Sequence, residues 1–365
     1  MAANPIVDEC LSFPGKIAVI TMNPSVNEDD FHATDCLTTK YGPEKIVHFT
    51  WPDDFVAERY KMIETMGKIA EDKEIKAVLI SQQVQSTNAA IDKLKETRDD
   101  VFIVCCTIQE PVAESAKRAN LIFDLNRMGM SRAMVNQAKK QGAKAFVYYS
   151  FHRQISIQSF ARARDNVREL CKANGILFTD ATALDPTGEA GLAKARQFIL
   201  DDVPKFVAKY GEDTAFFCTN CQLQVPLIKA VVDCHAIYPQ PCCPSPFHGF
   251  PQALGLGKGE NFADLYHLIT EASRVVEEKN MTDRLSTWPV SASMLFINAG
   301  AEYAIRWING EVPKNDIDNR VLTACMKSYI KHAVGEESHV LVDSLTENGI
   351  TYNNLKLVLM SYLDF

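Results

Sequence analysis

Short apolar runs recur along the first third of the chain, and segments with helical periodicity separate them. The first run, residues 16–22, is bounded by Pro14-Gly15 and by Asn23-Pro24, a pattern typical of a buried parallel strand. Four runs of the same kind follow at residues 45–50, 76–81, 101–107 and 120–125. The alternation of strands and helices predicts a parallel sheet covered by helices on both faces.

The segment between the second and third runs shows the helical period most clearly. Its small and apolar side chains are spaced by four, three, four and three residues, as on one face of an α-helix. These residues are Val56, Tyr60, Ile63, Gly67 and Ala70. We therefore expect a helix over this segment, with these five positions facing the sheet.

The same alternation starts again in the middle of the chain. Strands are expected at residues 145–149, 176–179 and 214–218. Helices are expected at 129–141, from 160 to a stop at Asn174-Gly175, at 190–210 and through 227–232. The pattern thus predicts two α/β units in series, joined near residues 124–127 by a junction short enough to act as a hinge.

The last third is less regular. Residues 237–259 are rich in Pro, Cys and Gly and are expected to form a loop. Helices are expected at 262–278 and 293–309. Residues 340–343 are expected to form a strand and 355–360 a short helix or strand, and neither segment has a predicted place in the fold.

Composition and charge exclude several classes of protein. The chain has 365 residues, a net charge of -8 and no run of basic residues, so direct DNA binding is not expected. No apolar stretch is long enough for a membrane-spanning helix, and the first 14 residues lack the features of a signal peptide. As written, the chain is expected to be cytoplasmic. If an upstream signal was removed from the sequence, the expected location is instead periplasmic or lipid-anchored.

The eleven cysteines are expected to be reduced thiols, because their number is odd and two pairs, Cys105-Cys106 and Cys242-Cys243, are adjacent. The spacing from Cys218 and Cys221 through Cys234 and His235 to Cys242-Cys243 is similar to that of zinc ligands. However, Cys234 lies at the far end of a predicted helix, about 20 Å from its start at 1.5 Å per residue. We therefore expect no metal site. A redox Cys-x2-Cys pair at the start of that helix is the other alternative for Cys218 and Cys221.

No nucleophile motif Gly-x-Ser-x-Gly is present, and the eight histidines are scattered. We therefore assign no catalytic residue and no cofactor, and we do not expect an enzyme.

Two segments carry a resemblance to a known family. Residues 214–230, TAFFCTNCQLQVPLIKA, and residues 283–289, DRLSTWP, which lead to AGAEYAIR at 299–306, resemble the type I periplasmic-binding-protein superfamily. That superfamily includes the ligand-sensing cores of lac-repressor-like regulators. Asn220 stands at the family's Asn position, whereas Cys221 replaces the usual Asp. The chain also resembles a bacterial family labelled as transcriptional regulators by analogy of fold.

The resemblance implies two doubly wound parallel-sheet lobes with a hinge. Lobe 1 would comprise residues 15–125 and about 285–330, lobe 2 residues 126–284, and residues 331–365 a C-terminal extension without an assigned place. The chain is expected to cross between the lobes at 125–128, 249–262 and 284–288. The resemblance also implies a small polar ligand held in the cleft between the lobes.

Strand ends nominate the ligand-binding residues, because ligands of open parallel sheets bind beyond the carboxyl ends of the strands. Each nominated residue has a simpler alternative role as a cap, a turn residue, a plug between the lobes or one half of a surface salt bridge. The first lobe would contribute Asn23, Trp51, Ser81, Gln82 and Thr107, the second His152, Arg153, Asp180 and Asn220, and the returning crossover Trp288.

Three functions follow from this interpretation. The first is ligand binding by a solute-binding protein or a ligand sensor, with an ABC transporter or a regulatory protein as partner. The second is a cytoplasmic transcriptional co-regulator that acts through a partner protein. The third is an enzyme that uses the cleft for group transfer.

Overall fold

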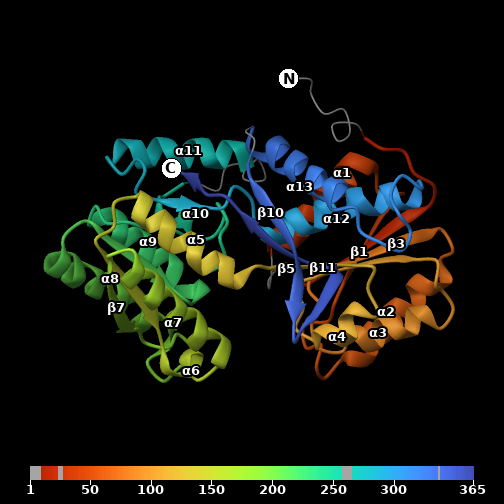
Figure 1. The fold of residues 1–365 in the computed structure, drawn as a ribbon, viewed down its shortest axis with the longest axis horizontal. Coiled ribbons are helices and arrows are strands. Elements are labelled where there is room, and N and C mark those ends of the chain that lie inside the picture. The colour runs from red at the N-terminus through yellow and green to blue at the C-terminus, as the bar shows by residue number, and fades with distance from the viewer. Residues whose placement is uncertain (1–9, 24–27, 257–264, 336–337) are drawn as a thin grey trace. The chain divides into compact units, whose positions relative to one another are not determined.

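Two units make up the structure, a computed structural model that describes residues 10–23, 28–256, 265–335 and 338–365. The first unit contains residues up to Leu125, then Ala292–His332 and Glu336–Leu359. The second contains Asn126–Ser291, Ala333–Gly335 and Met360–Phe365. Figure 1 labels the helices and strands of both units.

The first unit is built on one seven-stranded sheet, in the order β10-β11-β5-β4-β3-β1-β2. Its strands are β1 (Lys16–Thr21), β2 (Ile46–Thr50), β3 (Ile75–Ile80), β4 (Phe102–Cys106), β5 (Leu121–Leu125), β10 (Val340–Glu347) and β11 (Ile350–Met360). Its helices are α1 (Glu28–Tyr41), α2 (Arg59–Glu71), α3 (Thr87–Lys95), α4 (Val112–Ala116), α12 (Ala292–Ile308) and α13 (Asn319–Val334). The pairs among β1 to β5, and the pair of β11 with β5, are parallel, as the apolar runs predict.

Successive side chains of these strands face opposite layers of helices. Ile20, Ile80 and Ile103 share a buried cluster with residues of α2 and α3. On the opposite face lies α12, whose Phe296 stacks on Phe123 of β5 with 5.2 Å between ring centroids. Figure 1 shows α12 on one side of the strands and α2, α3 and α4 on the other. Helices therefore cover both faces of the sheet.

The predicted apolar face of α2 is right only in its second half. Val56 precedes the helix, and Val56 and Tyr60 are 55% and 59% exposed. Ala70 is buried and Ile63 packs partly against the same core cluster. The other buried residues of α2 are Met62, Met66 and Ile69, whose long apolar side chains fill the space against the sheet.

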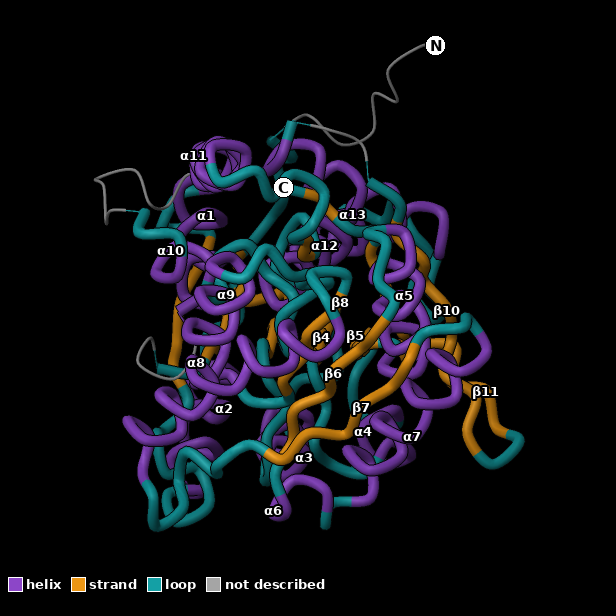
Figure 2. The backbone as a smooth tube through the Cα atoms, turned by 90° about the vertical axis from the view of Figure 1, so that its left-hand side faces the viewer, coloured by secondary structure: helices purple, strands orange, loops and turns teal. Residues whose placement is uncertain are grey.

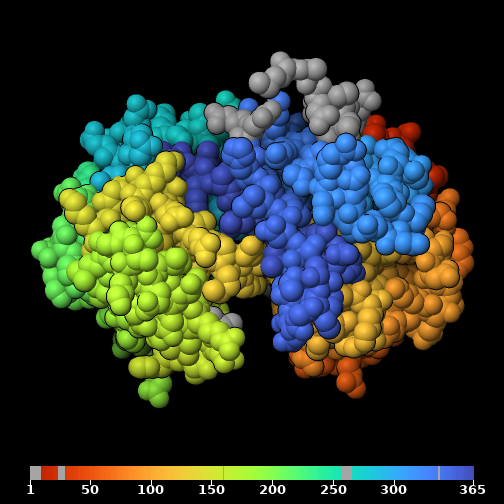
Figure 3. Space-filling model, viewed as in Figure 1, coloured from red at the N-terminus to blue at the C-terminus, as the bar shows by residue number. Residues whose placement is uncertain are grey.

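The sequence pattern did not predict where the C-terminal strands lie in the fold. Only Asn348 and Gly349 separate β10 from β11, and both have positive φ, 51° and 78°, as a tight hairpin turn requires. β11 then pairs in parallel with β5. Figure 3 shows this hairpin in blue on the surface of the first unit.

The second unit contains a three-stranded parallel sheet in the order β7-β6-β8. Figure 2 shows these three strands in orange. They are β6 (Ala145–Ser150), β7 (Leu177–Thr182) and β8 (Thr214–Cys218). The helices are α5 (Arg127–Lys140), α6 (His152–Ile155), α7 (Gln158–Ala173), α8 (Gly191–Tyr210), the 3-10 turn η1 (Cys221–Leu223), α9 (Gln224–Asp233), α10 (Phe250–Ala253) and α11 (Leu265–Glu278).

The last residues of the chain complete the second unit. β12 (Leu363–Asp364) pairs antiparallel with β9 (Ser286–Thr287). The backbone N–H of Phe365 donates to the carbonyl of Leu285 at 3.0 Å, and its ring packs against Phe250 with 4.8 Å between centroids. The segment after residue 330 is thus divided between the two units and does not form a separate extension.

The strands and helices expected from the apolar pattern are confirmed within a few residues where the structure describes them; residues 262–264 lie outside the described part. The unit boundary after Leu125 lies at the predicted junction. Residues 126–291 belong to one unit, so the crossing expected at 249–262 is wrong. The return to the first unit lies after Ser291, a few residues beyond the expected 284–288.

We predict that Gly300→Val destabilises the first unit by about 1–3 kcal/mol, because it overpacks a filled core. A Cβ atom at Gly300 would lie 3.2 Å from Val104 Cγ1 and 3.4 Å from a ring carbon of Phe123. Urea denaturation followed by tryptophan fluorescence measures the change.

Gly67→Ala in α2 is the matched control, since a Cβ atom there meets nothing within 4 Å. This variant should be as stable as the wild type, or more stable by up to about 1 kcal/mol. Equal stability of the Gly300→Val variant and the wild type would show that α12 does not pack closely on the sheet.

Candidate functional site

A buried carboxyl group organises the carboxyl edge of the first sheet. Asp30 of α1 is fully buried and accepts hydrogen bonds from Ser81 Oγ at 2.7 Å and Gln82 Nε2 at 3.3 Å. Burial raises the pKa of Asp30, and the hydrogen bonds from Ser81, Ser293 and Gln82 oppose this rise. Ser81 and Gln82, which we nominated as ligand contacts, therefore also anchor the start of α1 to the end of β3.

Trp51 directly follows β2 on the same edge. Its backbone N–H donates to the carbonyl of Thr21 at 2.9 Å, which continues the pairing of β2 with β1. The side chain is 2% exposed and belongs to a core cluster with Met22 and Ile80. Its indole Nε1 is buried and has no hydrogen-bond partner among the described residues. This edge thus holds a buried donor that makes no hydrogen bond to the described residues.

Thr107 follows β4 with a φ of 49°, a value unusual for a β-branched residue. Its backbone N–H donates to the carbonyl of Phe123 at 2.8 Å, and the residue is half-buried. Asn23 is half-buried after β1. Because β4, β3, β1 and β2 are neighbours in a parallel sheet, the five residues nominated in this unit lie along one edge. Strained backbone at such an edge is typical of binding sites.

In the second unit, two nominated residues follow β6. His152 and Arg153 begin α6 and are exposed. Arg153 donates from Nε to Asp185 Oδ2 at 2.8 Å and also contacts Thr187. The hydrogen bond from Arg153 holds the pKa of the Asp185 carboxyl well below its usual range. Arg153 therefore forms the surface salt bridge that was the simpler alternative for it.

Asp180 does not lie at a strand end. β7 continues to Thr182, so Asp180 lies inside the strand, opposite Tyr148 of β6. Its carboxylate forms ion pairs with Arg164 at 3.2 Å and Arg168 at 3.0 Å. The predicted strand was too short because its second half, residues 180–182, is mostly polar and exposed.

Asn220 has a structural role as a cap, and Trp288 is buried in the second unit. The Asn220 side chain accepts a hydrogen bond from the backbone N–H of Gln222 at 2.9 Å and so caps η1. Trp288 follows β9 in the second unit and is fully buried. The structure thus groups five nominated residues on the edge of the first sheet and keeps the others in the second unit, with Asp180 inside a strand.

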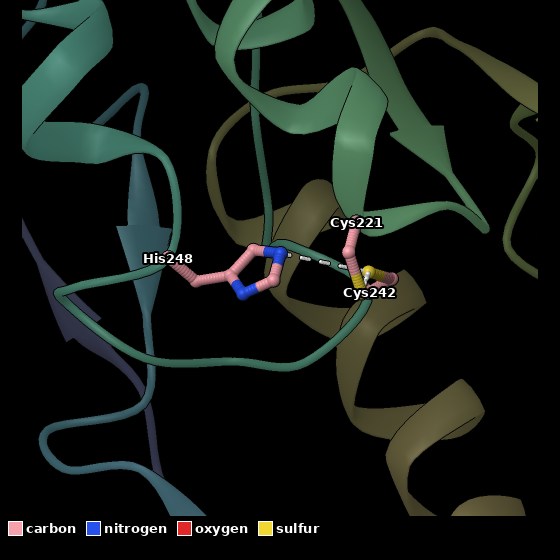
Figure 4. Close-up of side chains that lie close together, drawn as sticks. All are labelled: Cys221, Cys242 and His248. Atoms are coloured by element: carbon pink, nitrogen blue, oxygen red, sulfur yellow. Dashed lines mark hydrogen bonds between the residues drawn. The ribbon is translucent and has the colours of Figure 1, made fainter. Parts of the chain in front are cut away.

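Cys221, the residue after Asn220, belongs to a cluster of thiols and one imidazole that was not predicted from the sequence. Cys221 Sγ lies 3.4 Å from Cys242 Sγ and 3.9 Å from Cys243 Sγ. His248 Nε2 lies 3.8 Å from Cys242 Sγ (Figure 4). Hydrogen bonds with Cys242 and Cys243 lower the pKa of the Cys221 thiol. Hydrogen bonds with Cys221 and Cys243, together with burial, raise the pKa of the Cys242 thiol. All eleven cysteines lie in the described part of the chain and are free thiols.

One sequence signal pointed toward this cluster. Residues 242, 243 and 248 lie in the loop rich in Pro, Cys and Gly, just after the helix that Cys221 begins. The zinc spacing weighed from the sequence included Cys221, Cys242 and Cys243, which the structure brings together. It also included Cys218, which is buried in β8, and Cys234, which lies beyond the end of α9, and it lacked His248.

The fold is of the type I periplasmic-binding-protein-like class, as the resemblance implied. The crystal structure of a "putative transcriptional regulator" from Clostridium difficile 630 matches it with a TM-score of 0.86 and 20% identity, over 97% of this chain and all of that one. The substrate-binding protein of a sugar ABC transport system from Bordetella parapertussis 12822 matches with a TM-score of 0.54 and 12% identity, over 99% and 92% of the two chains.

The chain belongs to the family DUF3798, described as a protein of unknown function, whose family model matches residues 15–286. An uncharacterized protein of Treponema pallidum (strain Nichols) is 30% identical over 167 residues, which cover 46% of this chain and 77% of that protein. None of the helices in the described residues is long and apolar enough to cross a membrane.

We predict that Asp30 makes stability depend on pH. Between the ordinary carboxyl pKa of about 3.9 and the raised pKa in the fold, the unfolded chain has lost this proton and the folded chain retains it. Stability therefore falls as the pH rises through this window. Asp30→Asn removes the titration, so the wild type should lose unfolding free energy relative to the variant across the window and then level off.

Urea denaturation of both proteins at a series of pH values measures this difference. If the difference stays constant from about pH 4 to pH 8, Asp30 titrates alike in the folded and unfolded chain, and the argument from its burial is wrong.

Proposed function

We propose that this protein binds a small polar solute at the carboxyl edge of the first parallel sheet. The observation that carries the proposal is the buried indole N–H of Trp51, which has no acceptor among the described residues. The fold supports it, because open parallel sheets bind ligands beyond the carboxyl ends of their strands. The Bordetella parapertussis protein, whose fold is similar, is the substrate-binding protein of a sugar ABC transport system.

The indole N–H favours a ligand that accepts hydrogen bonds. A buried donor without a partner costs about 1–3 kcal/mol. A hydroxyl or carbonyl oxygen of a solute would accept this hydrogen bond and remove the cost. The unpaired donor therefore favours the bound state of the protein over the free state. The neighbouring groups at this edge have matching chemistry, since Asn23 and Gln82 carry amides and Thr107 carries a hydroxyl.

Residues near the strand ends of the second unit offer further groups to a ligand. His152 is exposed, and the amide nitrogen of Asn220 is not used by the cap, which takes its oxygen. Arg153 is held by Asp185, so it would position the α6 segment and would not bind an anion directly. We therefore expect a neutral, hydroxyl-rich solute in preference to an anionic one.

Binding of this kind serves either delivery to an ABC transporter or control of a partner protein. Group transfer at the same site is the competing activity. Recovery of the solute unchanged after prolonged incubation with stoichiometric protein would support binding alone. Appearance of a product would replace this proposal with an enzyme.

We predict that a thermal-shift screen of pentoses, hexoses and polyols identifies a stabilising solute, since a ligand that binds only the folded state raises the melting temperature. Trp51→Phe keeps an aromatic ring and removes the N–H. This variant should bind the solute about 5- to 100-fold more weakly, because it leaves a ligand acceptor unmatched at about 1–3 kcal/mol. Isothermal titration calorimetry measures the affinities.

Trp307→Phe is the control, because the Trp307 indole donates to the carbonyl of Lys314 at 3.2 Å. It should bind the solute as the wild type does. Unchanged affinity in the Trp51→Phe variant would move the site away from the edge of the first sheet.

A further inference from the structure

Three potential metal ligands, Cys221, Cys242 and His248, lie close together in the second unit, and Cys243 lies beside Cys221. Cys221 comes from the start of η1, and Cys242, Cys243 and His248 come from the loop that follows α9. The ligand atoms of Cys221, Cys242 and His248 all lie within 4.8 Å of one another. Figure 4 shows the imidazole ring with one nitrogen directed at the sulfur atoms. Two separate segments of chain thus present soft ligand atoms to the same small volume.

The spacing of these atoms fits a tetrahedral ion. Zinc with Zn–S bonds of about 2.3 Å and Zn–N bonds of about 2.0 Å places its sulfurs about 3.8 Å apart and a sulfur and a nitrogen about 3.6 Å apart. The distances from Cys221 Sγ to the two loop sulfurs are 3.4 and 3.9 Å, and the distance from Cys242 Sγ to His248 Nε2 is 3.8 Å. Each value lies within a few tenths of an ångström of a tetrahedral edge.

Other pairings account for the cluster less well. Thiols are weak hydrogen-bond donors and acceptors, so their mutual hydrogen bonds do not explain why three of them gather. A disulfide needs a sulfur–sulfur distance of about 2.05 Å, much shorter than the 3.4 Å between Cys221 and Cys242. Two thiols and an imidazole, the groups of Cys221, Cys242 and His248, are ligand types that zinc prefers.

Hydrogen bonds outside the cluster hold Cys221 in place. Gln224 is fully buried, and its Nε2 donates to the carbonyls of Cys218 at 3.0 Å and Asn220 at 2.7 Å. The hydroxyl of Tyr238 donates to Gln224 Oε1. Gln224 thereby ties the turn that carries Cys221 to the start of the loop that carries the other ligands. Supporting contacts of this kind fix the geometry of metal ligands.

The end of the loop is fixed in the same way. The backbone N–H of His248 donates to the carbonyl of Ser245 at 3.1 Å, and that of Phe247 donates to Ser245 Oγ at 3.2 Å. Gly249 has a φ of 87°, and a Cβ atom there would lie 3.1 Å from Ile228 Cδ1. The glycine therefore permits the close approach to α9 that turns His248 toward the thiols.

We propose that Cys221, Cys242 and His248 bind one Zn²⁺ ion. Cys221 is exposed, so the ion can enter from solvent. Because these three residues belong to the second unit, this site stands independently of the proposed solute binding. Its position directly after Asn220 places it at the carboxyl end of β8, where the ion would fix the loop beside that strand.

The test uses the full chain, kept reduced, stripped with EDTA and titrated with ZnSO₄ in competition with a chromophoric chelator. We expect one zinc per chain by elemental analysis. Loss of a supporting contact alone weakens metal binding about 10- to 100-fold, so Cys221→Ser and Cys242→Ser, which remove ligands, should each weaken it more than about 100-fold. Cys234→Ser should keep wild-type affinity, since Cys234 lies outside the cluster.

A second measurement on the wild type does not depend on how the variants fold. Co²⁺ added in place of zinc should give the sulfur-to-cobalt charge-transfer absorption and the strong d–d bands of a tetrahedral thiolate site. Less than stoichiometric zinc, or equal zinc affinity in all three cysteine variants, would overturn the proposal. So would octahedral cobalt bands without charge transfer. Failure of zinc to bind, together with normal solute binding, would refute only the metal site and leave the proposed function standing.

Discussion

Parallel pairing of β1 with both β2 and β3 is the constraint on which the rest of the first unit depends. Parallel strands end at the same edge, so residues that follow β1, β2, β3 and β4 are neighbours although they are far apart in the chain. Asp30 adds to this constraint, because its buried carboxyl binds Ser81 and Gln82 and ties α1 to the same edge. The candidate binding chemistry is thus a consequence of strand direction and needs no sequence motif.

Local signals in the sequence predicted the central strands well and the peripheral ones poorly. The strands β1 to β6 and β8 are apolar runs with clear boundaries, and each was predicted within a residue or two. The predicted β7 ended early because its second half is polar. The place of β11 depends on its pairing with β5, for example Leu355 with Ile122, which local periodicity does not reveal. Asn348-Gly349 was the local signal for the hairpin that the sequence analysis missed.

Prediction of the candidate sites from local sequence shows the same limit. Position at a strand end predicts where a side chain lies, but it does not predict which other groups of the protein it binds. Arg153 is paired with Asp185, and Asn220 uses its oxygen to cap η1. The thiol cluster depends on how the loop after α9 folds back on η1, and the hydrogen bonds of Gln224 that hold it are formed only in the tertiary structure. Spacing alone therefore did not separate Cys221, Cys242 and Cys243 from Cys218 and Cys234, which lie outside the cluster.

The most direct test of a binding site at the edge of the first sheet is the NMR signal of the indole N–H groups. The chain has three tryptophans, so their signals can be assigned with single substitutions. Addition of a solute found by screening should shift the Trp51 indole resonance and leave that of Trp307, which is bonded to Lys314, in place. A shift of the Trp307 resonance with an unchanged Trp51 resonance would contradict the account.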